Sequence, residues 1–136
     1  MYKRIAVLLL SLFCITVVGF AQTCRDKNNM TIGKIESDGT VRNSSNIKIG
    51  SFDRNNVIRD ANNMKVGSID GSTIRDKNNM KIGSIENNGT VRDANNMKIG
   101  SVESNGTVRD ANNMKIGSME GVNQTYAAVF YFFNLF

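Results

Sequence analysis

The sequence predicts an all-β fold made of tandem β-hairpins, and three observations support this prediction. A motif whose fullest form reads Arg-Asp-Ala-Asn-Asn-Met-Lys-Ile-Gly-Ser occurs in six versions, with 16 or 17 residues between successive starts at Arg25, Arg42, Arg59, Arg75, Arg92 and Arg109. Turn-forming residues recur about every eight or nine residues, and no window keeps the apolar spacing of an amphipathic helix. A repeat this short is one supersecondary unit stacked many times, so the fold follows from the repeat.

Each repeat contains two short runs that favour strands, separated by a turn. In the last repeat the strand candidates are residues 106–109 and 114–120, where apolar and polar residues alternate. Between them, Asp110 can bond the backbone two residues on, and the asparagines that follow tolerate left-handed backbone. Asn-Gly or Asp-Gly joins most repeats, which predicts type I′ turns with positive φ at both central residues. The result is an antiparallel meander of hairpins.

The glycine of the second strand raises a question about which side chains face the core. Met80 and Ile82 share one face of a regular strand, whereas Ile85 would point to the other. Either both faces are partly buried, or Gly83 lies in a bulge that returns Ile85 to the core side. An isolated glycine in a strand often marks a bulge, which favours the second interpretation.

A single hairpin is marginally stable in water, so the repeats must share a core. Each offers Val, Met, Ile and a second Ile or Val at equivalent positions, and the six together can bury a continuous core. The alternatives are an open hairpin solenoid and a closed ring. Closure removes the two exposed sheet edges, so we expect a closed ring.

The first 21 residues have the features of a secretory signal peptide. Two positive charges precede a long apolar run, and Gly19-Phe20-Ala21 places small residues where a signal peptidase reads. Cleavage after Ala21 predicts an exported protein that is periplasmic, associated with the outer membrane, or extracellular. Cys24 would then be the one remaining cysteine, and we expect a free thiol near a frayed terminus, with an intermolecular disulfide as the alternative.

The repeat domain spans residues 22–125 and is followed by an aromatic segment at residues 126–136. This segment holds six of the seven aromatic residues that would follow the signal peptide, Phe52 being the other. It is too short to span a bilayer as a helix. Three interpretations stay open. The segment packs on the repeats as a plug or covering strand, it exposes a membrane or partner surface through Phe130, Phe132, Phe133 and Phe136, or Phe136 is an outer-membrane assembly signal.

Basic side chains recur on one face of the hairpins and form the candidate ligand face. Its arginines would be Arg59, Arg75, Arg92 and Arg109, with an anionic glycan, a lipid headgroup or nucleic acid as the ligand. Acidic residues accompany each arginine, so cross-strand ion pairs are the simpler explanation. Nucleic acid is disfavoured as a partner because the repeats lack exposed aromatic residues for base stacking.

The composition argues against most catalytic and metal-binding chemistry. The chain has no histidine and two cysteines, one of them in the signal peptide, so zinc sites and Ser–His or Cys–His nucleophiles are excluded within one chain. The repeated Asp-x-Asn-Asn resembles the start of a calcium loop, but its remaining ligands are missing and turn formation explains it. Carboxylate pairs such as Glu86 and Asp93 recur in every repeat, so none is singled out for catalysis. We therefore expect no cofactor, no metal and no enzymatic activity.

Two stretches depart from the repeat. Residues 54–57 and 71–73 look like altered turns, with one residue deleted. The function we expect is an exported structural or binding module of unknown ligand, with a possible envelope glycan or protein as its partner. The alternative is a peripheral component of the outer membrane or envelope, attached through the aromatic segment.

The combination of these features resembles the five-fold β-flower proteins, secreted proteins of Bacteroidetes. The resemblance rests on the signal peptide ending in Phe-Ala-Gln, on the tandem units, and on the final Ala-Ala-Val-Phe segment; its residues are Asn88-Gly89-Thr90-Val91-Arg92-Asp93, Ile99-Gly100-Ser101-Val102 and residues 127–133. It implies hairpins around a central axis and no established activity, so no functional residue is transferred. This chain has six units where the family name implies five. The unit at Arg25 is therefore expected to be a cap or closing half-unit, with a six-fold ring as the alternative.

Overall fold

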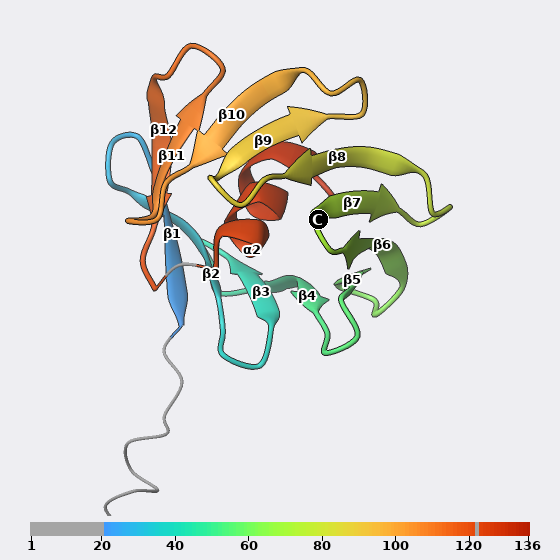
Figure 1. Cartoon of the computed structure of the whole chain (residues 1–136). Helices are drawn as coiled ribbons and strands as arrows, with labels where there is room; N and C mark the ends of the chain where they lie inside the picture. Colours follow the sequence, from blue (N-terminus) through green and yellow to red (C-terminus); the bar gives the residue numbers. More distant parts are fainter. Residues whose placement is uncertain (1–20, 122) are drawn as a thin grey trace, which may run out of the picture.

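The computed structural model describes residues 21–121 and 123–136, so the expected signal peptide lies outside the described residues except for Ala21. The described chain forms a closed antiparallel barrel in which each strand pairs with its neighbours in sequence (Figure 1). The hairpins surround the final helical segment like petals, which confirms the predicted all-β ring and excludes the open solenoid.

The strands are short and alternate regularly with turns. They are β1 (Gln22–Asp26), β2 (Thr31–Ile35), β3 (Thr40–Asn43), β4 (Lys48–Phe52), β5 (Val57–Asp60), β6 (Lys65–Asp70), β7 (Thr73–Asp76), β8 (Lys81–Ile85), β9 (Thr90–Asp93), β10 (Lys98–Val102), β11 (Thr107–Asp110) and β12 (Lys115–Met119). A short helix α2 (Gln124–Ala128) and a π-helix η1 (Val129–Phe133) follow.

The ring contains six complete hairpins, so the expectation of a half-unit at Arg25 is wrong. Strand β1 pairs with β2 on one side and with β12 on the other, where Cys24 faces Met119 and Arg25 faces Ser118. The reason is visible in the sequence. Gln-Thr-Cys-Arg at the start of β1 takes the place of Gly-Thr-Val-Arg in later repeats, so a full strand is available.

The turn inside each hairpin, which we call the hairpin tip, has the predicted Asx geometry. At one tip, Asp60 Oδ1 accepts hydrogen bonds from the backbone N–H groups of Asn62 (2.9 Å) and Met64 (3.0 Å). Asn63 completes the turn with a φ of 66°. The six tips repeat this arrangement, which confirms that the Asp-x-Asn-Asn segments form turns.

The turns that join hairpins differ from the type I′ prediction. Gly39 has a φ of 93°, but Asp38 before it is not among the described residues with positive φ. The backbone N–H of Gly39 donates to Glu36 O (2.9 Å), which makes a three-residue loop. A type I turn followed by one left-handed residue matches strand twist as well as a type I′ turn does, and it needs only the final glycine. The predicted deletion is confirmed, because Asp70 pairs with Thr73 and leaves a two-residue loop.

A β-bulge precedes the strand glycine, as the pattern predicts. Arg75 pairs with Lys81 and Ile74 with Gly83, so Ile82 is the extra residue. The shift returns Ile85 to the core, where it is 5% exposed. Met80 does not join it. The methionine stays in the tip before β8 begins and is 65% exposed, so its expected place in the core is wrong.

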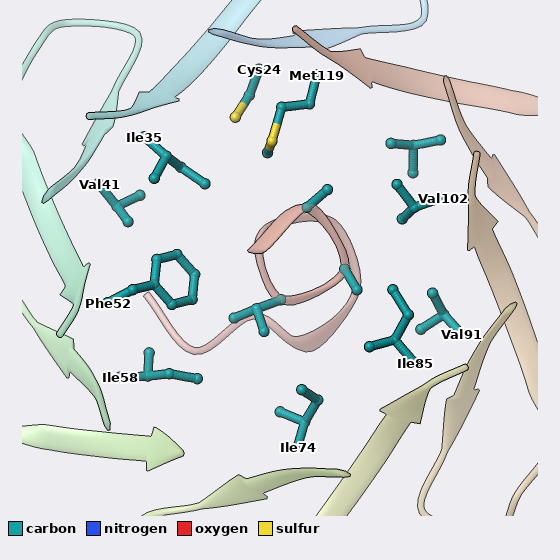
Figure 2. Packing of buried hydrophobic residues seen from close by; sticks show 14 residues of the cluster. Cys24, Ile35, Val41, Phe52, Ile58, Ile74, Ile85, Val91, Val102 and Met119 are labelled. Carbon is teal, nitrogen blue, oxygen red and sulfur yellow. The ribbon is translucent and has the colours of Figure 1, made fainter. Parts of the chain in front are cut away.

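The core is a ring of side chains that point at the central helix (Figure 2). One layer comes from the first strand of each hairpin and consists of Cys24, Val41, Ile58, Ile74, Val91 and Val108. Cys24 is therefore a core residue with no exposed surface, and the frayed terminus expected around it is wrong. Burial raises the pKa of its thiol from 9.0 to about 12.

Candidate functional site

The final segment enters the ring as a helix, so the covering strand considered for it is wrong. Asn123 caps α2, since its Oδ1 accepts the backbone N–H of Tyr126 (3.1 Å). Gln124 Nε2 donates to the backbone oxygen of Val102 (2.9 Å) and ties the helix to β10. Ala127 and Ala128 are fully buried, because small side chains let the helix backbone approach the wall of the ring.

Each hairpin holds one side chain of the segment against its strand glycine. The six pairs are Gly33 with Phe130, Gly117 with Tyr131, Gly100 with Phe132, Gly83 with Phe133, Gly67 with Leu135, and Gly50 with Phe136. A Cβ at Gly100 would lie 2.5 Å from both Cε1 and Cζ of Phe132, far inside van der Waals contact. The strand glycines are thus slots for the segment, and each also leaves room for the backbone oxygen of an arginine on the neighbouring strand, 2.4–2.6 Å from where a Cβ would lie. Sequence reasoning related them only to the bulge.

The helix geometry explains how consecutive residues reach consecutive hairpins. Residues 130 to 133 contact the first, sixth, fifth and fourth hairpins in turn, and Leu135 and Phe136 contact the third and second. Neighbouring hairpins are separated by one sixth of a turn around the ring axis. An α-helix turns by about 100° per residue, which is more than this separation. The wider π-helix η1 turns less per residue, so its successive side chains come closer to the spacing of the hairpins. Asn134, exposed and left-handed with a φ of 48°, then lets the last two side chains continue the circuit.

The four phenylalanines proposed for membrane contact lie in this circuit. Phe130, Phe132, Phe133 and Phe136 are partly buried and pack against the core. In the described part of the chain, no helix has both the length and the apolar character needed to cross a membrane.

The arginines of the candidate ligand face are all ion-paired. Arg59 Nε lies 3.2 Å from Asp53 Oδ2, Arg75 Nε lies 3.5 Å from Asp70 Oδ2, and Arg109 Nε lies 2.6 Å from Glu103 Oε1. Arg92 pairs with Glu86 in the same way. The Nη1 atom of each donates to an asparagine backbone oxygen in its own tip, at 3.2 Å. These arginines fasten tips to strands, and their charge is largely neutralised.

The closing seam has its own hydrogen bond. The Tyr131 hydroxyl lies 2.6 Å from Arg25 O and 2.8 Å from Ser118 O, so its single proton is shared between the two strands that close the ring. Burial raises the pKa of Tyr131, and the nearby Cys24 adds to this effect. The hydroxyl therefore stays protonated, as a donor must.

A groove lies beside the first turn of α2, at the end of the ring where the hairpins are joined, and is lined by four of the joining turns. It consists of neighbouring depressions of roughly 180 to 240 Å³ that share lining residues. The depression over Phe52 shares Tyr126 with a middle depression over Asn56 and Ile69. The middle depression shares Gly71 and Thr125 with a third one over Ser72 and Asn87. The groove continues over Ser72 and Asn87 into a more open depression. The two irregular stretches of the sequence both border it, at Arg54 and at Gly71.

The aromatic floor of the groove is specific to one repeat. Phe52 stands where other repeats have Ile, Val or Met, and its ring stacks on Tyr126 with centroids 4.0 Å apart. Phe52 is buried, whereas Tyr126 is partly exposed and reaches two of the depressions. The sequence signals of this groove were Phe52, noted only as the one aromatic residue outside the final segment, and the stretches at Arg54 and Gly71, which sequence reasoning assigned to altered turns.

Two carboxylates of the groove remain ionised. A hydrogen bond from the backbone N–H of Thr40 lowers the pKa of Asp38. A hydrogen bond from the backbone N–H of Val57 is the main cause of the lowered pKa of Asp53, with Arg59 contributing. Arg54 is exposed and has no ion pair among the described residues.

In residues 21–121 and 123–136, no cluster of three or more His, Cys, Asp or Glu side chains could hold a metal ion.

Comparison with known proteins gives one finding. A family model described as 5-fold beta-flower protein matches residues 21–135, almost the whole described chain. Comparisons with curated proteins and with solved structures find no match.

Proposed function

The chain belongs to the five-fold β-flower family, and from this premise we propose that it is an exported, non-enzymatic binding module that holds a neutral oligosaccharide in the groove around Tyr126. The family description names an architecture rather than an activity, so the proposal rests on the groove. Export rests on the signal peptide expected at residues 1–21.

The observation that carries the proposal is where the groove lies. Five of the six hairpins place an aliphatic or methionine side chain at the position of Phe52. The four loops that join hairpins elsewhere have three residues, one more than the loop at Gly71. The groove forms where both exceptions meet the helix. A ring of equivalent repeats can close without Phe52 and without the shorter loop at Gly71. A role in the groove therefore explains these two exceptions better than a role in closing the ring.

The chemistry of the groove suits a sugar. Tyr126, backed by Phe52, offers an apolar platform for the C–H face of a sugar ring. Asn56, Asn123 and Thr125 line the same depression as Tyr126, and Ser72 and Asn87 line the next one. The side chains of Ser72, Asn87 and Thr125 make no hydrogen bond with another described residue. A few polar groups around an aromatic surface are typical of binding sites. Asp53 and Glu86 are each paired with an arginine, which leaves Asp38 and Arg54 as opposite charges in the groove, so the lining is close to neutral and suits a neutral ligand.

The titration behaviour of the groove supports binding rather than catalysis. A general acid at neutral pH needs a carboxyl group with a raised pKa. Asp38 and Asp53 both have lowered pKa values, so both stay ionised and neither is suited to donate a proton. The alternative of attachment through the aromatic segment would require Phe130, Phe132, Phe133 and Phe136 to leave their glycine slots.

The test is titration of the processed chain, residues 22–136, with a panel of neutral tetrasaccharides of glucose, mannose and N-acetylglucosamine, followed by NMR. We expect one of them to shift the amide signals of the groove. Tyr126→Ala should weaken binding by about tenfold or more, equivalent to about 1.4 kcal/mol. Tyr131→Phe, which changes an aromatic residue outside the groove, should leave the affinity unchanged.

The proposal fails if none of the sugars shifts the groove signals at millimolar concentration. It also fails if Tyr126→Ala and Tyr131→Phe change the affinity equally. An Arg54→Ala variant adds a check on ligand charge, because only an anionic sugar should depend strongly on that guanidinium.

A further inference from the structure

The opposite end of the ring carries a repeated apolar residue that the core does not use. One large apolar side chain at each hairpin tip is 61–65% exposed: Met30, Ile47, Met64, Met80, Met97 and Met114. Scattered exposed apolar residues are ordinary on protein surfaces. Here the same position is exposed to nearly the same degree in all six hairpins, so these side chains form a regular set rather than scattered ones.

The topology gathers these side chains at one end. In a closed meander, all turns between the first and second strand of a hairpin lie on the same side of the ring. The turns between hairpins, with the groove, lie on the other side. The six tips therefore form one rim around the ring axis, which we call the tip rim.

Lysines stand beside the apolar residues of the tip rim. An exposed lysine directly follows the apolar residue in five hairpins, at Lys48, Lys65, Lys81, Lys98 and Lys115. The aspartates of the tips are half-buried, and the Oδ1 of each is occupied by two backbone N–H groups of its own turn, as at Asp93. The ion pairs found among the described residues all use arginines and none uses these lysines. The rim thus presents apolar side chains flanked by ammonium groups.

From this arrangement we propose that the tip rim docks end-on to a lipid bilayer that carries anionic headgroups. Methionine side chains would enter the interface while lysines contact the headgroups, a combination that drives peripheral membrane binding. Each lysine near an anionic surface adds a favourable electrostatic contribution. One tip is a weak contact, and six on a rigid ring bind together because the later contacts are intramolecular.

The shape and charge of the rim select a bilayer over other partners. A flat surface meets all six tips at once, whereas a peptide or a small ligand reaches only a few. A second ring stacked rim to rim would place lysines opposite lysines. A soluble polyanion would satisfy the lysines but would leave the methionines in water. This inference is independent of the sugar site, which lies at the other end of the ring.

The test uses residues 22–136, the part of the chain that forms the ring, and vesicle flotation. The vesicles are phosphatidylcholine alone or phosphatidylcholine with about one quarter phosphatidylglycerol. We expect at least about tenfold stronger binding to the anionic vesicles, with partial loss at high salt. A variant with Met64→Ser, Met80→Ser, Met97→Ser and Met114→Ser should lose about tenfold or more. These side chains are exposed, so the fold should remain intact.

A matched control changes four exposed residues at the opposite end, Ser37→Ala, Ser72→Ala, Asn87→Ala and Ser104→Ala, and should bind vesicles like the unaltered chain. A second variant with Lys65→Gln, Lys81→Gln, Lys98→Gln and Lys115→Gln should lose the preference for anionic vesicles. Binding that the methionine variant retains, or equal binding to both kinds of vesicle, overturns the proposal. So does a failure to bind either kind of vesicle.

Discussion

The strand glycines act through the space they leave empty, unlike the glycines of the turns. Gly39, Gly89 and Gly106 have φ between 90° and 94°, so a side chain there would strain the backbone. The strand glycines do not have positive φ. They are needed because a Cβ would meet both the final segment and the backbone oxygen of an arginine on the neighbouring strand, the latter at 2.4–2.6 Å; they are Gly33, Gly50, Gly67, Gly83, Gly100 and Gly117. The two kinds of glycine thus respond to different substitutions.

Gly100→Ala should lower the free energy of unfolding by about 1–3 kcal/mol, the usual cost of forcing extra volume into a packed core. The new Cβ would lie 2.4 Å from the backbone oxygen of Arg109 and 2.5 Å from the ring of Phe132, and only the second clash can be changed by substituting a side chain. Shortening the opposing side chain should relieve part of the clash, so Phe132→Leu should be less costly in the Gly100→Ala background than alone. Urea denaturation measures both. A simple sum of the two single effects would show that residues 100 and 132 do not share a slot.

Cys24 makes the stability depend on pH in the alkaline range. Its folded pKa of about 12 exceeds the ordinary value of 9.0. The raised pKa contributes stability that is complete below pH 9 and is lost as the pH rises towards 12, because only the unfolded thiol ionises there. Cys24→Val, which copies Val41 and Val91, should be close to neutral at pH 7 and less sensitive between pH 9 and 11. Parallel stability curves for the two proteins would contradict this assignment.

The hydroxyl at the seam gives a third prediction at this scale. Tyr131→Phe should lower the free energy of unfolding by about 1 kcal/mol, the net value of one hydrogen bond. Tyr126→Phe is the matched control, because the Tyr126 hydroxyl has no hydrogen-bond partner among the described residues. Comparable losses in both variants would remove the special role of the Tyr131 hydroxyl.

At the scale of the hairpin, the tips depend on one left-handed asparagine. Asn96 has a φ of 67°, a conformation that asparagine tolerates and alanine does not. Asn96→Ala should destabilise the protein by about 1–2 kcal/mol, whereas Asn96→Gly should be nearly neutral. Thermal unfolding measures the difference. If alanine and glycine have the same effect, the tip does not need left-handed backbone at this position.

The hairpins were also the elements that sequence patterns predicted best. Strands, tips, bulges and the deletion beside Gly71 follow from local turn chemistry and alternation, which act within a few residues. The type of the joining turn did not follow, because Asn-Gly fits either loop length and the register decides between them. Met80 was misplaced because the pattern does not show where the strand begins.

The helical segment and the groove were beyond local patterns. Residues 130–136 have no helical periodicity, and their π-helix follows from six slots spaced around a ring. Tertiary context of this kind overrides intrinsic propensity. The groove joins turns from several hairpins to Tyr126, so its residues come together only once the ring has closed. Cys24 looked terminal in sequence, although its strand pairs with β12 at the seam.

At the scale of the whole molecule, the ring and its final segment specify each other. Six glycine slots and six large side chains match one to one, and the family description names a five-fold arrangement where this chain has six hairpins. The core layer that faces the helix also depends on the segment. Without α2 and η1, side chains such as Ile58 and Val91 would line an empty channel.

The most direct test of this account is therefore to remove the segment. A chain that ends at Asn123 should lack the dispersed NMR spectrum of a folded ring, because the inner layer then faces water. Co-expression of residues 123–136 as a separate peptide should restore the spectrum, and a peptide with Phe132→Ala and Phe133→Ala should not. A truncated chain that keeps the full dispersed spectrum and the stability of the intact protein would contradict the claim that the ring is built around its final segment.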